Sequence, residues 1–178
     1  DVKFVVAALY KFVRLENAPH LRSQLQALCD QAGLQGTILI ANEGINGTIA
    51  APSSAMEQML EWLQADRRFN DMSLKLSATD SQPFLRMKVR LKREIVTMGC
   101  PDIEPAKSTG TYIEPANWNA LIRDPDVMLI DTRNTYETAI GMFDGATDPN
   151  TANFRDFPKW AADLAQRPVA TRPKKLAM

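Results

Sequence analysis

Residues 37–50, TILIANEGINGTIA, contain two apolar segments separated by turn residues. Residues 37–41 and 45–50 are rich in isoleucine, threonine and alanine, which favours two short strands. Between them, Asn42, Glu43 and Gly44 supply the residue types that turns require. The stretch therefore predicts an antiparallel hairpin.

Two predicted helices flank this hairpin. Residues 18–32 carry leucines at helical spacing and are followed by Gly33, a common helix-ending residue. Residues 53–65 place methionines and leucines on one helical face, and Ser53 or Ser54 is available to cap the first turn.

Two further strands complete the pattern. Residues 4–10, FVVAALY, predict a buried strand, and residues 72–77 alternate apolar and polar side chains. The resulting order is strand, helix, strand, strand, helix, strand. This order predicts an α+β domain of the ferredoxin-like type over residues 1–96, with both helices on one face of the sheet.

A strongly basic strand is predicted at the end of this domain, in residues 84–93, FLRMKVRLKR. Its alternation places Arg86, Lys88, Arg90 and Lys92 on one face and apolar side chains on the other. A row of cations can follow a phosphate backbone. It can equally protect an edge strand from aggregation, so both interpretations stay open.

The composition changes after residue 96. Residues 97–114 are rich in proline, glycine, threonine and acidic side chains, which indicates a linker, and residues 115–178 form a second domain. In that domain we expect helices at residues 115–122, 135–139 and 158–166 and strands at residues 127–130 and 174–178.

The strand at residues 127–130 ends in a charged corner. Asp131 and Arg133 follow it directly, and buried charges need partners. Arg133 and Glu137 lie four residues apart and can pair if the chain turns helical. We therefore expect a structural ion pair at this corner or, alternatively, residues that frame a pocket.

The turn at residues 41–48, ANEGINGT, presents a similar choice. Asn42, Glu43 and Asn46 can place polar groups in a cleft. Alternatively, they serve only the geometry of the hairpin, which is the simpler interpretation.

The composition limits the class of protein. The formal net charge is zero, from 21 basic and 21 acidic residues, so only a local basic patch can attract nucleic acid. No apolar segment is long enough to span a membrane. Cys29 and Cys100 lack metal-ligand spacing, and their presence suits a reducing, cytoplasmic location. We expect Cys29 to be buried, and we identify neither a metal site nor a cofactor.

Residues 41–48, 84–96 and 127–158 together resemble the rhodanese-domain tRNA uridine hydroxylases. The resemblance implies a ferredoxin-like domain followed by the first part of an α/β rhodanese-like domain, here truncated. It also implies an oxygenase that modifies tRNA, hydroxylating the wobble uridine at C5 with molecular oxygen as co-substrate. The partner is tRNA, and the oligomeric state stays open.

The same resemblance implies several site residues. Asp131 and Arg133 would frame the pocket, and Arg86, Lys88, Arg90 and Lys92 would contact tRNA. The reactive cysteine of the family lies in a Cys-Thr-Gly-Gly-Ile-Arg-Cys loop after a strand like residues 175–178, and we expect it beyond Met178. No catalytic residue is therefore assigned, and the chain by itself is expected to be inactive.

Two alternatives remain. Residues 142–144 read Met-Phe-Asp where many rhodanese domains read His-Ile-Pro, which argues against a general thiosulfate sulfurtransferase. A rhodanese-type sulfurtransferase and a non-catalytic RNA-binding module are the competing hypotheses. We also expect residues after about 150 to pack poorly unless another chain or further residues complete the sheet, because only part of a parallel sheet is present.

Overall fold

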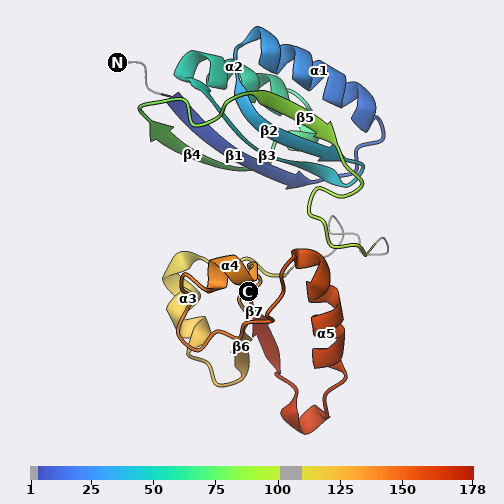
Figure 1. Cartoon of the computed structure of the whole chain (residues 1–178), viewed down its shortest axis with the longest axis vertical. Helices are drawn as coiled ribbons and strands as arrows, with labels where there is room; N and C mark the ends of the chain where they lie inside the picture. The colour runs from blue at the N-terminus through green and yellow to red at the C-terminus, as the bar shows by residue number, and fades with distance from the viewer. Residues whose placement is uncertain (1–3, 101–109) are drawn as a thin grey trace. The chain divides into compact units, whose positions relative to one another are not determined.

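A computed structural model of the chain describes residues 4–100 and 110–178. The described residues form two compact units, one of residues 4–96 and one of residues 97–100 and 110–178 (Figure 1). Much of the predicted linker, residues 101–109, lies outside the described residues. No helix within the described ranges has both the length and the apolar character needed to cross a bilayer.

The first unit is built on a five-stranded sheet in the order β4-β1-β3-β2-β5. The strands are β1 (Phe4–Phe12), β2 (Gln35–Ala41), β3 (Gly44–Pro52), β4 (Ser73–Thr79) and β5 (Met87–Leu91). The first four pair antiparallel, and β5 joins β2 in parallel. The order of the first four strands confirms the predicted ferredoxin-like α+β fold.

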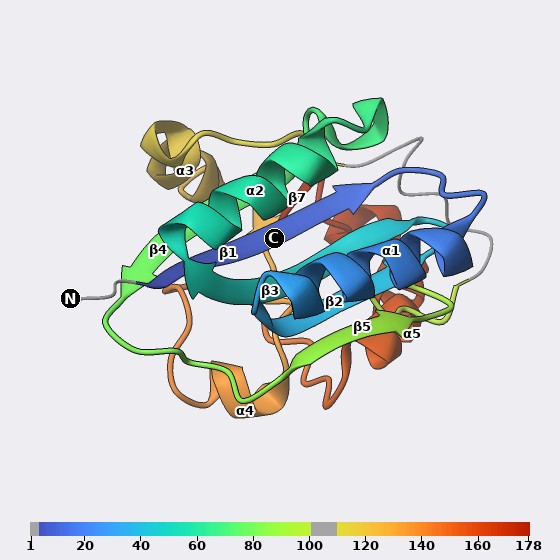
Figure 2. The ribbon, with the colours of Figure 1, turned by 90° about the horizontal axis from the view of Figure 1, so that it is seen from above.

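Both helices of this unit lie on one face of the sheet (Figure 2). They are α1 (Ala18–Gln31) and α2 (Ser53–Gln64), and the short 3₁₀ helix η1 (Arg67–Phe69) follows α2. The prediction that Ser53 or Ser54 caps α2 is wrong. The helix begins directly at Ser53, and the N-cap residue is Pro52, whose side chain makes no capping hydrogen bond.

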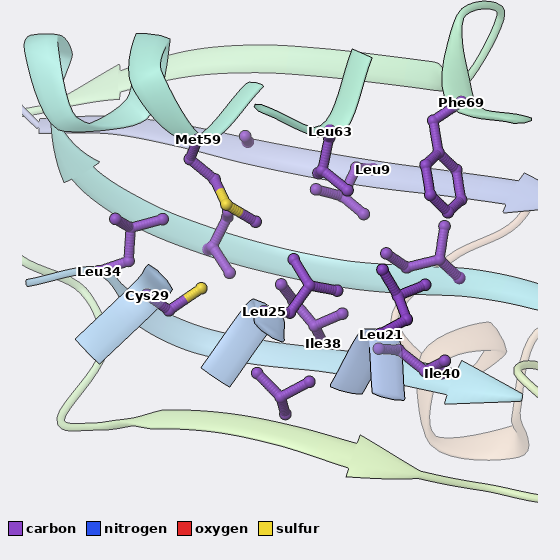
Figure 3. Packing of buried hydrophobic residues seen from close by; sticks show 14 of the residues in the cluster. Leu9, Leu21, Leu25, Cys29, Leu34, Ile38, Ile40, Met59, Leu63 and Phe69 are labelled. Atoms are coloured by element: carbon purple, nitrogen blue, oxygen red, sulfur yellow. The ribbon is translucent and has the colours of Figure 1, made fainter. Parts of the chain in front are cut away.

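The core of the unit fills the space between helices and sheet (Figure 3). Leu21 and Leu25 of α1 and Met59 of α2 are buried against Ile38 of β2. Burying a side chain of this kind contributes about 1.5–3 kcal/mol, so this layer dominates the stability of the unit. Cys29 is completely buried here, and burial raises the pKa of its thiol to about 12. Its thiol therefore stays protonated.

The hairpin between β2 and β3 depends on a glycine. Gly44 has φ +150°, a backbone conformation that L side chains rarely adopt. A β-carbon at this position would overlap the carbonyl oxygen of Lys11 on β1. Only glycine allows β1 and β3 to approach this closely at the turn.

Strand β5 forms the outer edge of the sheet, and helix α1 holds it there. Arg22 Nε donates a hydrogen bond to the carbonyl oxygen of Val89 at 3.0 Å, and the amide of Val89 donates to Gln26 Oε1 at 3.0 Å. The strand is shorter than the predicted residues 84–93, since pairing with β2 starts at Met87. Leu85, which the alternation places on the same face as the buried Val89, is 97% exposed.

The second unit contains a two-stranded parallel sheet of β6 (Val127–Leu129) and β7 (Lys175–Ala177). Its helices are α3 (Pro115–Ile122), α4 (Thr135–Thr138) and α5 (Phe157–Ala165), and its 3₁₀ helices are η2 (Phe154–Asp156) and η3 (Val169–Thr171). Phe157 and Leu164 of α5 are buried against Ile130. The expectation that residues after about 150 pack poorly is therefore wrong for α5.

Candidate functional site

The second unit contains a pocket of about 660 Å³ at the carboxyl end of β6. Ligands of parallel sheets commonly bind at this end of the strands. Apolar side chains dominate the walls: Trp118 of α3, Leu129, Ile130, Met142, Phe143, Ala146, and Met178 directly after β7. The polar lining residues are Asp131, Thr132 and Arg133. The two charged residues singled out from the sequence thus lie in the pocket wall.

Asp131 and Arg133 form a bidentate ion pair. Arg133 Nε donates to Asp131 Oδ1 at 2.9 Å, and Arg133 Nη2 donates to Asp131 Oδ2 at 2.7 Å. The hydrogen bond from Arg133 also keeps the pKa of the Asp131 carboxyl below its usual value. Arg133 Nη2 further donates to the carbonyl oxygen of Gly141 at 2.6 Å, which ties the end of β6 to the glycine turn.

The four-residue spacing predicts that Arg133 pairs with Glu137. In the structure Arg133 pairs with Asp131 instead. Glu137 Oε2 instead accepts a hydrogen bond from the backbone amide of Asn134 at 3.1 Å and closes a capping box at the start of α4. The Asn-x-x-Glu pattern in the sequence is the signal that could have predicted this.

The sequence alone does not indicate that two aromatic residues, Trp118 and Phe143, belong to one site. The rings of Trp118 and Phe143 lie 5.9 Å apart between centroids. The indole Nε1 of Trp118 is buried and has no hydrogen-bond partner among the described residues. Because the two residues are 25 positions apart (143 minus 118), only the fold brings them together.

The hairpin residues proposed from the sequence have structural partners. Glu43 Oε1 accepts a hydrogen bond from the amide of Ile95 at 2.6 Å, and Asn46 Nδ2 donates to the carbonyl oxygen of Ile95 at 3.3 Å. Asn42 is exposed, and its carbonyl oxygen accepts from the amide of Leu15. These contacts fasten the segment that follows β5, and none of the three residues lines the large pocket.

The basic row lies on β5 and beside it. Arg86, Arg90 and Lys92 are exposed and Lys88 is half-buried. The positive charge of Arg86, then partial desolvation and the charge of Arg90, lower the pKa of Lys88. The cations are therefore close enough to repel one another, which concentrates positive potential at this edge.

Neither cysteine belongs to the pocket lining. Cys29 lies in the core of the first unit, and Cys100 is half-buried with its Sγ 4.0 Å from the carbonyl oxygen of Met98. Across the described part of the chain, no three His, Cys, Asp or Glu side chains are grouped so that they could hold a metal ion.

Comparison with known proteins identifies the family. The family model described as the UPF0176 acylphosphatase like domain matches residues 4–95, and the chain belongs to this family. The match covers the ferredoxin-like unit, including β5 and the segment fastened by Glu43.

Three curated relatives carry the name tRNA uridine(34) hydroxylase. The protein from Rhizobium leguminosarum bv. trifolii is 55% identical over 88% of this chain and 51% of its own length. Those from Agrobacterium fabrum and Caulobacter vibrioides are each 51% identical, over 98% and 97% of this chain and 55% and 56% of their own lengths. The chain thus spans about half the length of these relatives. Their names confirm the resemblance to tRNA uridine hydroxylases.

Proposed function

We propose that the complete protein hydroxylates the wobble uridine of tRNA at C5, with molecular oxygen as co-substrate. The observation that carries the proposal is identity of 51–55%, along most of this chain, to proteins named tRNA uridine(34) hydroxylase. The match extends across both compact units, since it reaches 98% of the chain in one relative. A tRNA substrate also favours a cytoplasmic location.

In this proposal the pocket of the second unit receives the uracil base. Chemistry on a base requires that the nucleotide leave its stack and enter a fitted pocket. The rings of Trp118 and Phe143 offer apolar and aromatic surface for such a base, and aromatic side chains commonly stack on unpaired bases. Arg133, held by Asp131 at the pocket wall, positions its guanidinium for a polar contact.

We further propose that the second unit is the first part of a rhodanese-like domain. Its parallel strands β6 and β7 and its glycine turn at residues 141–146 support this assignment. In such domains the reactive cysteine follows a strand that corresponds to β7. Met178, the residue after β7, lines the pocket, so a cysteine in the loop that follows would lie close to the bound base.

The basic row on β5 would contact the tRNA backbone. The competing interpretation was that these cations protect an edge strand. The outward amide and carbonyl of Val89 are already bonded to Gln26 and Arg22 of α1, so this part of the edge is blocked without them. A role in binding phosphates through Arg86, Lys88, Arg90 and Lys92 is therefore the better explanation.

Nucleoside mass spectrometry of tRNA tests the activity. In cells that lack the complete gene, we expect loss of 5-hydroxyuridine and of the nucleosides derived from it. Unchanged amounts would refute the proposal, whereas loss of a thiolated nucleoside would favour the sulfurtransferase alternative.

Complementation makes the test specific to the pocket. We expect a gene carrying Trp118→Ala or Arg133→Ala to restore little of the modification. Arg167→Ala changes an exposed arginine of the same unit outside the pocket lining and should restore it fully.

A further inference from the structure

The sheet of the first unit has one face that carries neither α1 nor α2, the only long helices among the described residues of that unit (Figure 1). We call it the open face. Its side chains come from alternate positions of each strand. They include Tyr10 of β1, Asn46 and Thr48 of β3, and Thr37 and Leu39 of β2. The register aligns these positions in rows that cross the sheet.

Two adjacent rows of side chains supply the cationic, polar and aromatic groups of the open face. The first runs Ser73, Tyr10, Asn46, Leu39, Arg90, and the second runs Lys75, Ala8, Thr48, Thr37, Lys88. These ten residues include three cations and no acid. They also include small polar groups at the centre and an exposed aromatic ring, since Tyr10 is 45% exposed.

A hollow of about 240 Å³ lies between these rows. It is lined by Thr37, Leu39, Asn46, Gly47, Thr48 and Phe84. Phe84 forms a wall because the segment before β5 is anchored to the sheet, where Gln82 Nε2 donates to the carbonyl oxygen of Ala50 at 3.2 Å. The hollow thus has an aromatic wall, hydroxyl and amide groups, and cations beside it.

A second aromatic residue, Tyr10, lies beside the hollow without lining it, and its ring has a fixed neighbour. The ring of Tyr10 meets that of Phe12 edge to face, with centroids 5.8 Å apart and planes at 84°. Tyr10 is paired in register with Asn46, a lining residue, and Arg90 is paired with Leu39 on the other side. Three strand spacings separate Tyr10 from Arg90, about 14 Å, so one short segment of RNA can reach both.

From this arrangement we infer that the open face binds an unpaired RNA nucleotide, with the base in the hollow against Tyr10 and Phe84 and the phosphates at Lys88 and Arg90. Aromatic side chains and cations on a sheet surface are the means by which proteins bind single-stranded nucleic acid. The inference rests on the proposed function for the choice of RNA. It adds a second nucleotide site, separate from the pocket lined by Trp118.

Fluorescence anisotropy of the 178-residue chain with a labelled single-stranded RNA of about ten nucleotides tests the inference. We expect tighter binding to this RNA than to its duplex. Tyr10→Ala should weaken binding roughly fivefold to a hundredfold without changing the salt dependence, since no charge is lost. Tyr10→Phe should bind like the unmodified chain.

Matched variants show whether weaker RNA binding results from loss of base stacking or from loss of folded structure. Tyr112→Ala removes a tyrosine that is 78% exposed in the second unit and should leave binding unchanged. Thr48→Glu places a negative charge in the hollow and should abolish binding, whereas Ser54→Glu adds the same charge at an exposed position of α2 and should not. Thermal melting of each variant verifies that it is folded in the assay.

Equal affinity for single-stranded and duplex RNA would overturn the inference, and so would wild-type affinity of both Tyr10→Ala and Thr48→Glu. These results leave the proposed function intact if tRNA from gene-deficient cells still lacks 5-hydroxyuridine. Conversely, RNA binding that depends on Tyr10, together with unchanged nucleosides, would refute the hydroxylase and support the open-face site.

Discussion

The guanidinium of Arg133 donates hydrogen bonds to both carboxylate oxygens of Asp131, two residues before it in the chain. The Asp131 side chain is only 8% exposed, whereas that of Arg133 is 46% exposed. The carboxylate is therefore the buried member of the pair and the guanidinium the accessible one. This arrangement fixes Arg133 at the pocket wall while part of it still faces solvent.

The pairing predicts a pH dependence. The hydrogen bond from Arg133 lowers the pKa of Asp131 in the folded state, so the pair contributes stability above about pH 4, the usual range for Asp. That contribution is lost as the pH falls through the lowered folded pKa. Unfolding measured from pH 7 to pH 2 should show a stability difference between the unmodified chain and Arg133→Gln that disappears in acid. Arg167→Gln is the control, and a difference independent of pH would contradict the prediction.

The core of the first unit predicts a large effect from one leucine. Leu25 is completely buried between α1 and the sheet, and Leu25→Ala should reduce the free energy of unfolding by about 2–5 kcal/mol. Leu85→Ala removes the same atoms from a side chain that is 97% exposed and should change it by less than about 0.5 kcal/mol. Urea titration measures both, and similar values would contradict the assigned core.

The hairpin glycine predicts a backbone effect. Gly44→Ala introduces a β-carbon that overlaps the Lys11 carbonyl oxygen at a φ of +150°, so it should destabilise the chain by at least about 1–3 kcal/mol. Gly110→Ala is the matched control, because a β-carbon there meets no heavy atom within 4 Å. Thermal unfolding of the two variants gives the comparison. Equal melting temperatures would show that the turn can relax.

The basic row predicts how tRNA binding depends on salt. Arg86→Glu should weaken binding of tRNA and reduce the slope of log affinity against log salt by about one, the value for one lost phosphate contact. Arg67→Glu makes the same charge change at an exposed position after α2 and should have little effect. Filter binding at several salt concentrations measures the slopes. An unchanged slope for Arg86→Glu would favour the alternative that the basic row only protects the edge strand from aggregation.

Much of the first unit could be predicted because its residues obey local rules. Leu21 and Leu25 of α1 are buried, as their helical spacing predicts. The alternation in β4 holds only in part, since Leu74 is half-buried but Leu76 is 56% exposed. Before β5 the pattern fails for another reason, because the alternation in the sequence begins before the strand pairing does. Leu85 continues the alternation of β5, but β2 offers no partner before Gly36, so Leu85 stays in solvent.

The candidate site was less predictable, since it depends on contacts between distant segments. Asp131 and Arg133 were recognisable because charges directly after an apolar strand need partners. The partner of Arg133 was misassigned because local spacing also allowed Glu137, and the capping box at Asn134 decided the outcome. Nothing local in residues 115–122 indicates that Trp118 meets Phe143.

The attachment of β5 has a consequence for dividing the chain. The ferredoxin-like order is complete at Thr79, so a cut there looks harmless on topological grounds. It would nevertheless strip β5 from β2 and expose a strand edge that carries Ile38 and Ile40, a template for intermolecular pairing. The shortest fragment of the first unit that stays monomeric should therefore extend through Val96, past the amide of Ile95 that Glu43 binds.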